Sequence, residues 1–178
     1  DLLTDLYNRR AFREQVEAAI KKQKKKFSAL VMWDLDNLKY INDTYGHDEG
    51  DRYIVLFAGC LKIFSERGGI VARYSGDEFV TFLEADEKDE IRKKVREFMK
   101  HIQKFSLNTE EGYRFPIRVS GGLSWYPDDA GDFETLFNYA DFAMYMVKHS
   151  VKGIVKEFDL KEYTHNSYML AGSEELNR

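Results

Sequence analysis

The spacing of apolar residues changes several times along the chain, between a helical period and continuous or alternating runs, which predicts both helices and strands. From Phe12 to Ile20, apolar residues recur at every fourth position and mark one face of a first helix. We expect Thr4 or Asp5 to cap this helix, and we expect it to end near Lys25 within a cluster of lysines. Positive charge there suits the negative end of the helix dipole.

A nearly continuous apolar run at residues 27–33 predicts a central strand that is buried on both faces. The run ends in two acids, Asp34 and Asp36, which would share a face if the strand continued. We expect the chain to turn there, so that one of the two acids caps the next helix. That helix, at residues 37–45, is short and stops at Gly46.

The rest of the chain continues this change between helical and strand-like spacing. The expected elements, in order, are a long helix that follows residues 47–51 and ends at Gly68 and Gly69, a hairpin built from apolar segments 70–72 and 80–83, a helix that starts at Asp86 or Asp89, a polar loop at 108–112, a half-buried strand from Phe115 to Trp125, a helix from Phe133 to Val147, and a short strand at 154–158.

Helices separate most of these strands and one hairpin is present, which predicts an α+β fold with a mixed central β-sheet and helices packed on it. We expect one domain at residues 1–159. Residues 160–178 are mostly polar, apart from Tyr163 and residues 168–170, and we interpret them as a linker toward a following domain or as the start of a helix. The chain begins at Asp1 without a methionine, and we interpret it as a domain excised from a longer protein.

Composition and charge narrow the class of protein. Of 178 residues, 33% are charged and 43% are hydrophobic, and 27 basic against 31 acidic side chains give a net charge of -4. This balance argues against a nucleic-acid binder, which usually carries a basic excess. No apolar run reaches the length of a membrane span and no signal peptide opens the chain, so we expect no membrane contact by this domain.

The single cysteine, Cys60, excludes an intramolecular disulfide and fits a reducing compartment. It falls on an apolar helix face, so we expect a buried thiol and not a nucleophile. We therefore expect a cytoplasmic domain, with or without a membrane anchor elsewhere in the parent protein.

Candidate chemistry lies at the tip of the predicted hairpin, where Ser75 and Gly76 form a favourable turn pair before Asp77 and Glu78. A turn needs neither acid, which favours a functional role for the pair. The simpler interpretation is that the acids are only exposed to solvent, as in most acidic turns. In the predicted topology, the strand end at Asp34 lies beside this tip. Carboxylates that converge from neighbouring strands form the oxygen-rich site that Mg²⁺ prefers.

Other polar residues fit a nucleotide ligand. Lys39, Lys148 and Lys152 are able to supply positive charge to a polyphosphate, and Asn42 and Asp51 carry donors and acceptors of the kind that read a purine edge. Each residue also has a simpler interpretation. The lysines are exposed by default, Asn42 suits a turn or a cap, and Asp51 suits a helix N-cap.

Four segments together resemble one known family. They are LTDLYNRR at residues 3–10, DLDNLKYINDTYGHDEGD at 34–51, RYSGDEF at 73–79, and the helix segment at 140–148. In this order and at these spacings, they resemble the GGDEF domain family, the diguanylate cyclases. The resemblance covers about residues 1–159 and departs at the signature, which reads SGDEF.

The resemblance implies a fold similar to the palm domain of class III nucleotidyl cyclases. It also implies a Mg²⁺-dependent reaction, with Mn²⁺ as an alternative ion, that condenses two GTP molecules into cyclic di-GMP and releases pyrophosphate. Each domain would hold one GTP, so a homodimer would be needed for catalysis. The full-length chain would carry sensory or phosphodiesterase domains as well.

The resemblance also implies roles for individual residues. Asp34 and Asp77 would bind the metal together with the backbone carbonyl of Leu35, Asp77 would assist deprotonation of the attacking 3′-hydroxyl, and Glu78 would complete the acidic tip. The implied substrate contacts are Asn42 and Asp51 to guanine with His47 nearby, Lys39 to the phosphates during transfer, Lys148 and Lys152 to the terminal phosphates, Ser75 and Gly76 at the close backbone approach, and Asn37 and Leu38 beside the nucleotide.

The chain departs from the family pattern at four places. Ser75 replaces the first glycine of the signature, Lys152 replaces an arginine, and Val151 replaces a glycine. The product-inhibition motif Arg-x-x-Asp is absent, because the window at residues 66–69 reads ERGG. These departures keep open a catalytically weak GTP-binding module that regulates an adjacent phosphodiesterase domain. A purely structural dimerisation module is a third alternative, which the number of retained polar positions disfavours.

Overall fold

The computed structural model describes residues 1–166, and its main feature is a five-stranded mixed sheet in the order β2-β3-β1-β6-β7. All neighbouring pairs are antiparallel except β6 and β7, which are parallel. The α+β class with a mixed central sheet is therefore confirmed. The sheet strands are β1 (Phe27–Leu35), β2 (Ile70–Arg73), β3 (Glu78–Ala85), β6 (Val119–Tyr126) and β7 (Val155–Glu157), and the helices are α1 (Arg9–Lys22), α2 (Leu38–Tyr45), α3 (His47–Glu66), α4 (Lys88–Ile102) and α5 (Phe133–Lys148).

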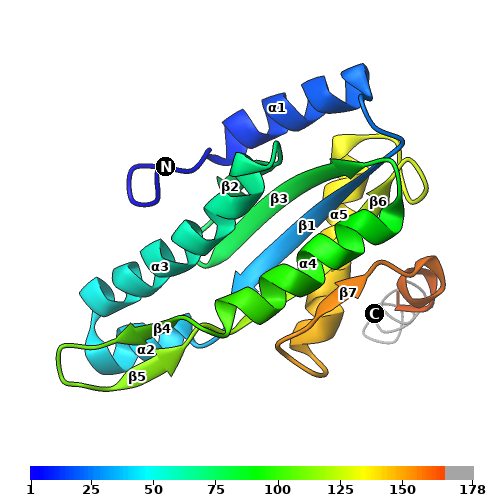
Figure 1. Cartoon of the computed structure of the whole chain (residues 1–178). Coiled ribbons are helices and arrows are strands. Elements are labelled where there is room, and N and C mark those ends of the chain that lie inside the picture. Colours follow the sequence, from blue (N-terminus) through cyan, green and yellow to red (C-terminus); the bar gives the residue numbers. More distant parts are fainter. Residues whose placement is uncertain (167–178) are drawn as a thin grey trace.

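Helices cover both faces of the sheet, and β1 lies in its centre (Figure 1). Side chains of β1 alternate between two apolar cores. Trp33 packs with Phe64 and Phe98 on the face covered by α3 and α4, while Leu30 and Met32 point to the face covered by α1 and α5. The nearly continuous apolar run in the sequence is thus explained by burial of β1 on both sides.

Strand β6 is also buried on both faces, so the prediction of a half-buried strand from Phe115 is wrong. The face expected to meet solvent carries Ser120, Gly122 and Ser124, and α5 covers it. A Cβ at Gly122 would lie 2.1 Å from the carbonyl oxygen of Ala140, which means that strand and helix touch through their backbones. Small residues alternate here because a helix packs at backbone distance.

Most helix starts differ from the predicted caps. Asn8 caps α1 by accepting a hydrogen bond from the backbone N–H of Ala11 at 2.9 Å, so neither Thr4 nor Asp5 is the cap. Helix α4 begins after Glu87 and not at Asp86 or Asp89, and α3 begins at His47, so Asp51 lies inside a helix and is no N-cap. The predicted stop of α2 at Gly46 is confirmed, with φ of 93° at that glycine.

A short second hairpin joins β4 (Ser106–Asn108) to β5 (Arg114–Pro116), where the sequence predicted only a polar loop at 108–112. Each strand has three residues, too few for a periodic signal. Residues 160–166 form a helical segment, whereas residues 168–170 and the rest of the predicted linker lie outside the described residues. The domain boundary at 159 stays a prediction.

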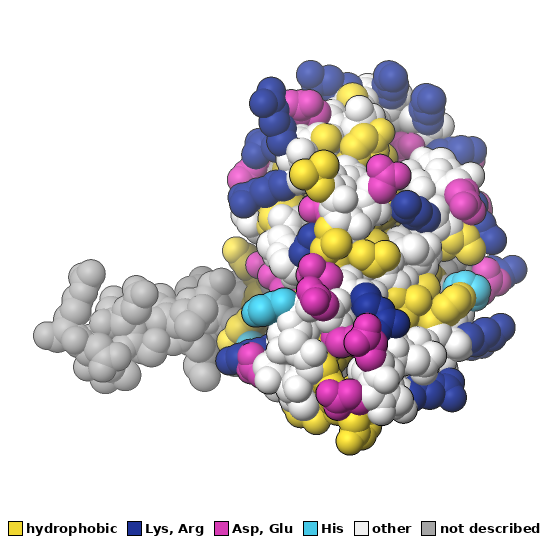
Figure 2. All heavy atoms as spheres, turned by 90° about the vertical axis from the view of Figure 1, so that its left-hand side faces the viewer, with side chains coloured by type: hydrophobic (Ala, Val, Ile, Leu, Met, Phe, Trp, Pro, Cys, Tyr) yellow, Lys and Arg dark blue, Asp and Glu magenta, His cyan; other side chains and the backbone are white. Residues whose placement is uncertain are grey.

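The face that carries the N-terminus, α2 and the β4–β5 hairpin shows acidic and basic side chains interspersed, without a patch of one sign (Figure 2).

No helix within residues 1–166 combines the length and the apolar character needed to cross a membrane. Cys60 is buried, as predicted.

Candidate active site

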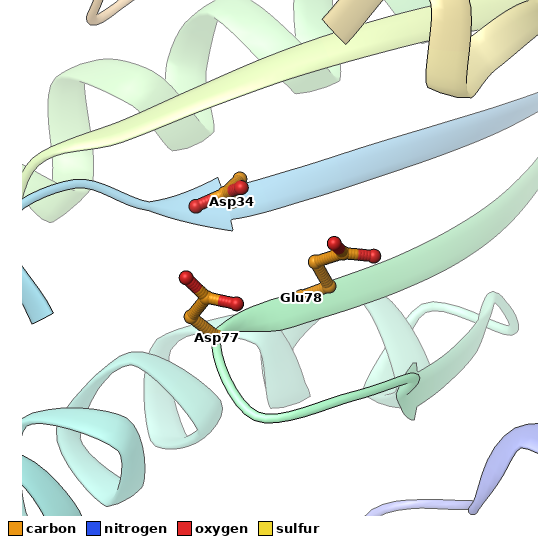
Figure 3. Close-up of side chains that lie close together, drawn as sticks. All are labelled: Asp34, Asp77 and Glu78. Carbon is orange, nitrogen blue, oxygen red and sulfur yellow. The ribbon is translucent and has the colours of Figure 1, made fainter. Parts of the chain in front are cut away.

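Three carboxylates converge where the end of β1 meets the start of β3. Asp34 and Glu78 are direct partners in the β1–β3 ladder, and the backbone N–H of Leu35 donates to the carbonyl oxygen of Asp77 at 3.0 Å. One oxygen from each of Asp34, Asp77 and Glu78 lies within 4.8 Å of the others, and Figure 3 shows all three side chains on the same side of the strands. The predicted meeting of strand end and hairpin tip is confirmed.

The hairpin tip is held by its own backbone and by one arginine. The backbone N–H groups of Tyr74 and Ser75 donate to the carbonyl oxygen of Glu78 at 2.8 and 3.2 Å. The guanidinium of Arg73 donates to the carbonyl oxygen of Gly76 at 3.0 Å. Asp77 therefore projects from a fixed turn, and the adjacent Ser75 and Gly76 are exposed. The serine in the signature leaves the hairpin intact.

Lys148, near the end of α5, enters the same site. Its ammonium lies 2.8 Å from Oδ1 of Asp34 and 2.6 Å from Oδ1 of Asp36. The strand continues to Leu35, so the two acids face the same helix, and the prediction that one of them caps α2 is wrong. Asn37 occupies the cap position, with a left-handed φ of 70°.

Burial and charge act on this group in opposite directions. Burial raises the pKa of Asp34, Lys148 counteracts the rise, and the neighbouring Asp77 adds to it. Burial also raises the pKa of Glu78, and repulsion from Asp141, Asp34 and Asp77 adds to that rise. Burial alone would lower the pKa of Lys148, but the adjacent carboxylates of Asp34 and Asp36 outweigh burial and raise the pKa. The carboxylates are thus short of positive charge.

The acidic cluster fits a hard divalent cation. Oδ1 of Asp34 is buried and accepts no hydrogen bond of acceptable geometry, although Nζ of Lys148 lies 2.8 Å away. The three side chains offer oxygen ligands only, the donor type of Mg²⁺ and Mn²⁺ sites. A cation between them would supply the charge that a single lysine does not.

Asp36 was not among the predicted site residues, yet it is buried and joins two parts of the site. Its Oδ2 accepts a hydrogen bond from Oγ of Ser120 at 2.9 Å, and Oγ of Ser120 accepts one from the backbone N–H of Gly153 at 3.0 Å. This chain of bonds links the end of β1 to the loop that carries Lys152. The signal in the sequence was an acid two positions after Asp34, on the same face of a strand.

The two predicted base-reading residues come from α2 and α3. Asn42 lies against Gly50, and a Cβ at Gly50 would come within 1.7 Å of Oδ1 of Asn42. Asp51 is the next residue and lines a surface cavity of about 450 Å³ together with Leu3 and residues of β4. Sequence reasoning missed Gly50, whose missing side chain gives Asn42 its place.

The remaining predicted residues surround this region less closely. Lys39 and His47 are exposed on α2 and α3. Leu38 is buried, while Asn37 and Lys152 line a second cavity of about 430 Å³. The structure brings carboxylate oxygens of Asp34, Asp77 and Glu78 within 4.8 Å of one another and places Lys148 against Asp34. It does not bring the other predicted side chains into contact with this group.

One known family matches most of the chain. A family model described as diguanylate cyclase, GGDEF domain, matches residues 1–153. The diguanylate cyclase DgcN of Escherichia coli is 33% identical over 153 residues, which is 84% of this chain and 36% of that protein. The bifunctional diguanylate cyclase/cyclic di-GMP phosphodiesterase MucR of Pseudomonas aeruginosa is 33% identical over 154 residues, 83% of this chain and 22% of that protein.

The chain thus spans between about a fifth and just over a third of the length of these curated relatives. Among solved structures, the isolated GGDEF domain of TpbB, also called YfiN, from Pseudomonas aeruginosa superposes with a TM-score of 0.86 at 25% identity, covering 94% of this chain and 98% of that one. This likeness confirms the fold that the sequence resemblance implied.

Proposed function

The chain belongs to the GGDEF domain family, and from this premise we propose that it is a diguanylate cyclase domain that condenses two GTP molecules into cyclic di-GMP and pyrophosphate. The observation that carries the proposal is the convergence of Asp34, Asp77 and Glu78 beside Lys148. Phosphoryl transfer needs mainly alignment of the reacting groups and neutralisation of developing charge. The three carboxylates, through a bound cation, and Lys148 would supply both.

Asp34 and Asp77, with the backbone carbonyl of Leu35, would hold Mg²⁺, or Mn²⁺ in its place. When bound, the ion would neutralise charge on the phosphate oxygens. Asp77 would accept the proton of the 3′-hydroxyl of one GTP while the 3′ oxygen attacks the α-phosphorus of the other GTP. Pyrophosphate then leaves with the electrons of the broken P–O bond, and a second transfer closes the ring.

The phosphates would lie at the start of α2, at the backbone N–H groups of Asn37 and Leu38, which follow the end of β1 after Asp36. Lys39 would stabilise charge during transfer, and Lys148 and Lys152 would contact the terminal phosphates. Lys152 would do so as a point charge, because a lysine lacks the two-pronged guanidinium of arginine.

Guanine would be recognised by Asn42 and Asp51, with His47 nearby and with the cavity beside Asp51 as the space for the base. A carboxylate accepts hydrogen bonds from guanine N1 and N2, whereas adenine would leave it unpaired at a cost of about 1–3 kcal/mol. Two domains would face each other in a C2 dimer, because each holds one GTP and the product needs two.

The test is turnover by the domain dimerised through a fused coiled coil. We expect GTP and Mg²⁺ to yield cyclic di-GMP and pyrophosphate, detected by chromatography, and we expect Asp77→Ala to abolish the product while GTP binding persists. The matched control is Asp5→Ala, because Asp5 is an exposed acid outside the acidic cluster. Binding of GTP by the native dimer without turnover would reject the cyclase assignment.

A second function is favoured by the exposed Ser75 in the signature and by the exposed Val151 beside Lys152. We propose as the alternative that the domain binds GTP, turns it over weakly and regulates an adjacent phosphodiesterase domain, an arrangement compatible with the bifunctional relative MucR. A Ser75→Gly variant separates the two proposals. A large gain in turnover would support the weak module, and unchanged turnover would support the cyclase.

A further inference from the structure

Asp36 shares Lys148 with the acidic cluster but lies outside that cluster. Its side chain is buried, and both carboxylate oxygens are engaged, Oδ1 by Nζ of Lys148 at 2.6 Å and Oδ2 by Oγ of Ser120 at 2.9 Å. The acidic group that could hold a cation consists of Asp34, Asp77 and Glu78. Both oxygens of Asp36 thus accept hydrogen bonds within the protein, and Asp36 is not one of the acids that could hold the cation.

The backbone holds Asp36 firmly in place. Its N–H donates to the carbonyl oxygen of Arg118 at 2.9 Å, and its own carbonyl oxygen accepts from the hydroxyl of Tyr53 at 3.3 Å. The same hydroxyl accepts from the N–H of Arg118 at 3.1 Å. Lys148, by contrast, reaches the site through a flexible side chain. Of the two partners, the carboxylate is the fixed one.

Lys148 also stands in the way of a cation. Its ammonium lies 2.8 Å from Oδ1 of Asp34, an oxygen that a bound cation would use. A cation bound to that oxygen would lie close to the ammonium, and two positive charges at short range repel each other strongly in a partly buried site. A divalent ion that binds Asp34 must therefore move the ammonium off that oxygen. Asp36 remains as the second carboxylate within its reach.

We propose that Asp36 is a positioning residue that retains Lys148 at the edge of the acidic cluster once a cation has displaced it from Asp34. The inference rests on the proposed function for its consequence, since the retained ammonium would then lie beside the incoming phosphates. Asp36 contacts neither metal nor substrate in this scheme and acts through Lys148. Without Asp36, Lys148 would be left with Asp34 alone and would compete more strongly with the cation.

The experiment measures Mn²⁺ binding by the domain without nucleotide, from the paramagnetic resonance signal of free Mn²⁺. We expect Lys148→Met to bind Mn²⁺ about tenfold more tightly than the native domain, because the competitor is gone. We expect Asp36→Asn to bind about fivefold more weakly. In the Lys148→Met background, Asp36→Asn should have less than half of that effect on a logarithmic scale.

Removal of any nearby negative charge weakens cation binding to some degree, and Asp141→Asn is the matched control for this contribution. Asp141 adds to the field at Glu78 and is exposed on α5. Its effect should be the same with Lys148 present or replaced. If Asp36→Asn weakens binding equally in both backgrounds, Asp36 acts only through its own charge and the inference is wrong.

Lys148→Met leaves the buried carboxylate of Asp36 without its cation, so thermal unfolding is recorded for every variant. If that variant does not fold, Lys148→Gln takes its place, because an amide still donates to Asp36 but carries no charge. The Mn²⁺ titration contains no GTP. A domain that fails the turnover test would therefore still return a clear result here, and the two failures remain distinguishable.

Discussion

Asp34 and Glu78 stand directly opposite each other on adjacent antiparallel strands, so the register of β1 and β3 alone brings their carboxylates together. Like charges on opposed positions of a ladder are destabilising. Burial raises the pKa of both groups, and repulsion from nearby carboxylates adds to the rise: Asp77 and Asp36 act on Asp34, while Asp141, Asp34 and Asp77 act on Glu78. Lys148 offsets only part of the rise at Asp34. We therefore expect a cation that binds these acids to stabilise the domain.

The first prediction follows from this repulsion. Glu78→Gln removes a carboxylate whose charged form is disfavoured in the folded state, so we expect the melting temperature without divalent ions to rise. A relief of about 1 kcal/mol would raise it by about 2–4 °C in a chain of this size. The measurement is differential scanning calorimetry, once with EDTA at about 10 mM and once with Mg²⁺ at about 10 mM in place of EDTA. Mg²⁺ should stabilise the variant less than the native domain, and an unchanged Mg²⁺ effect would contradict the assignment of Glu78 to the cluster.

The second prediction concerns two glycines of one helix. In Gly50→Ala, the new methyl group would lie 1.7 Å from Oδ1 of Asn42 and must push that side chain away. If Asn42 binds guanine, the loss of its hydrogen bond should weaken GTP binding by about 1–3 kcal/mol, seen by calorimetry. Gly59→Ala is the control, because its methyl group would meet open space. That variant should gain about 0.5–1 kcal/mol of stability and keep its GTP affinity.

The third prediction concerns acid stability. Burial raises the pKa of Glu157, but hydrogen bonds from Arg92 and Trp125 outweigh burial and lower it below the ordinary 4.5. A lowered acid pKa stabilises the fold above the unfolded value, and this contribution is lost as the pH falls through the folded value. Unfolding midpoints in urea between about pH 7 and pH 3 should therefore fall more steeply below about pH 4.5 for the native domain than for Glu157→Gln. Parallel curves would show that the bonds of Glu157 add nothing.

The fourth prediction concerns product feedback. The window where the family carries its Arg-x-x-Asp site reads Glu66, Arg67, Gly68 and Gly69. A Cβ at Gly69 would lie 2.9 Å from the carbonyl oxygen of Phe64, so an aspartate has no unstrained place there. We expect cyclic di-GMP to leave initial rates of the dimerised domain unchanged, apart from competition at the GTP site. Noncompetitive inhibition would reveal a different regulatory site.

The fifth prediction concerns the thiol of Cys60, which is 7% exposed. Burial raises its pKa to about 11. Because the thiolate is the reactive form, iodoacetamide at about pH 8 should modify Cys60 slowly in the native domain and rapidly in urea. Mass spectrometry of intact protein follows the reaction. Equal rates in both conditions would mean that α3 opens readily.

The sequence predicted the acidic corner well because its parts carry strong local signals. The buried apolar run ends in Asp34, and the predicted hairpin places Asp77 at its tip. If the two strands are neighbours, the two acids must lie close together. Helix starts were predicted poorly, because several capping residues stand near each start. Thr4, Asp5 and Asn8 all suit a cap, and only the folded backbone selects Asn8.

Contacts between distant segments were beyond the sequence. Ser120 belongs to an alternating pattern typical of a strand with one face in solvent, and only the packing of α5 shows that it meets Asp36 instead. Likewise, the spacing of Asn42 and Gly50 gives no sign that one fills the place left by the other. Alternation reports side-chain polarity, whereas burial depends on what packs against the strand.

The backbone contact at Gly122 limits how this domain can change. Elsewhere in the core, a larger or smaller side chain can adjust the gap between helix and sheet, but at Gly122 peptide groups already touch. Gly122 has no side chain that could be shortened, and every substitution would add atoms between the strand and the helix. The distance between α5 and β6 is thus set by direct contact of their backbones, and Lys148 is the last residue of that helix. Substitutions in the surrounding core should therefore alter stability before they alter the position from which the Lys148 side chain extends.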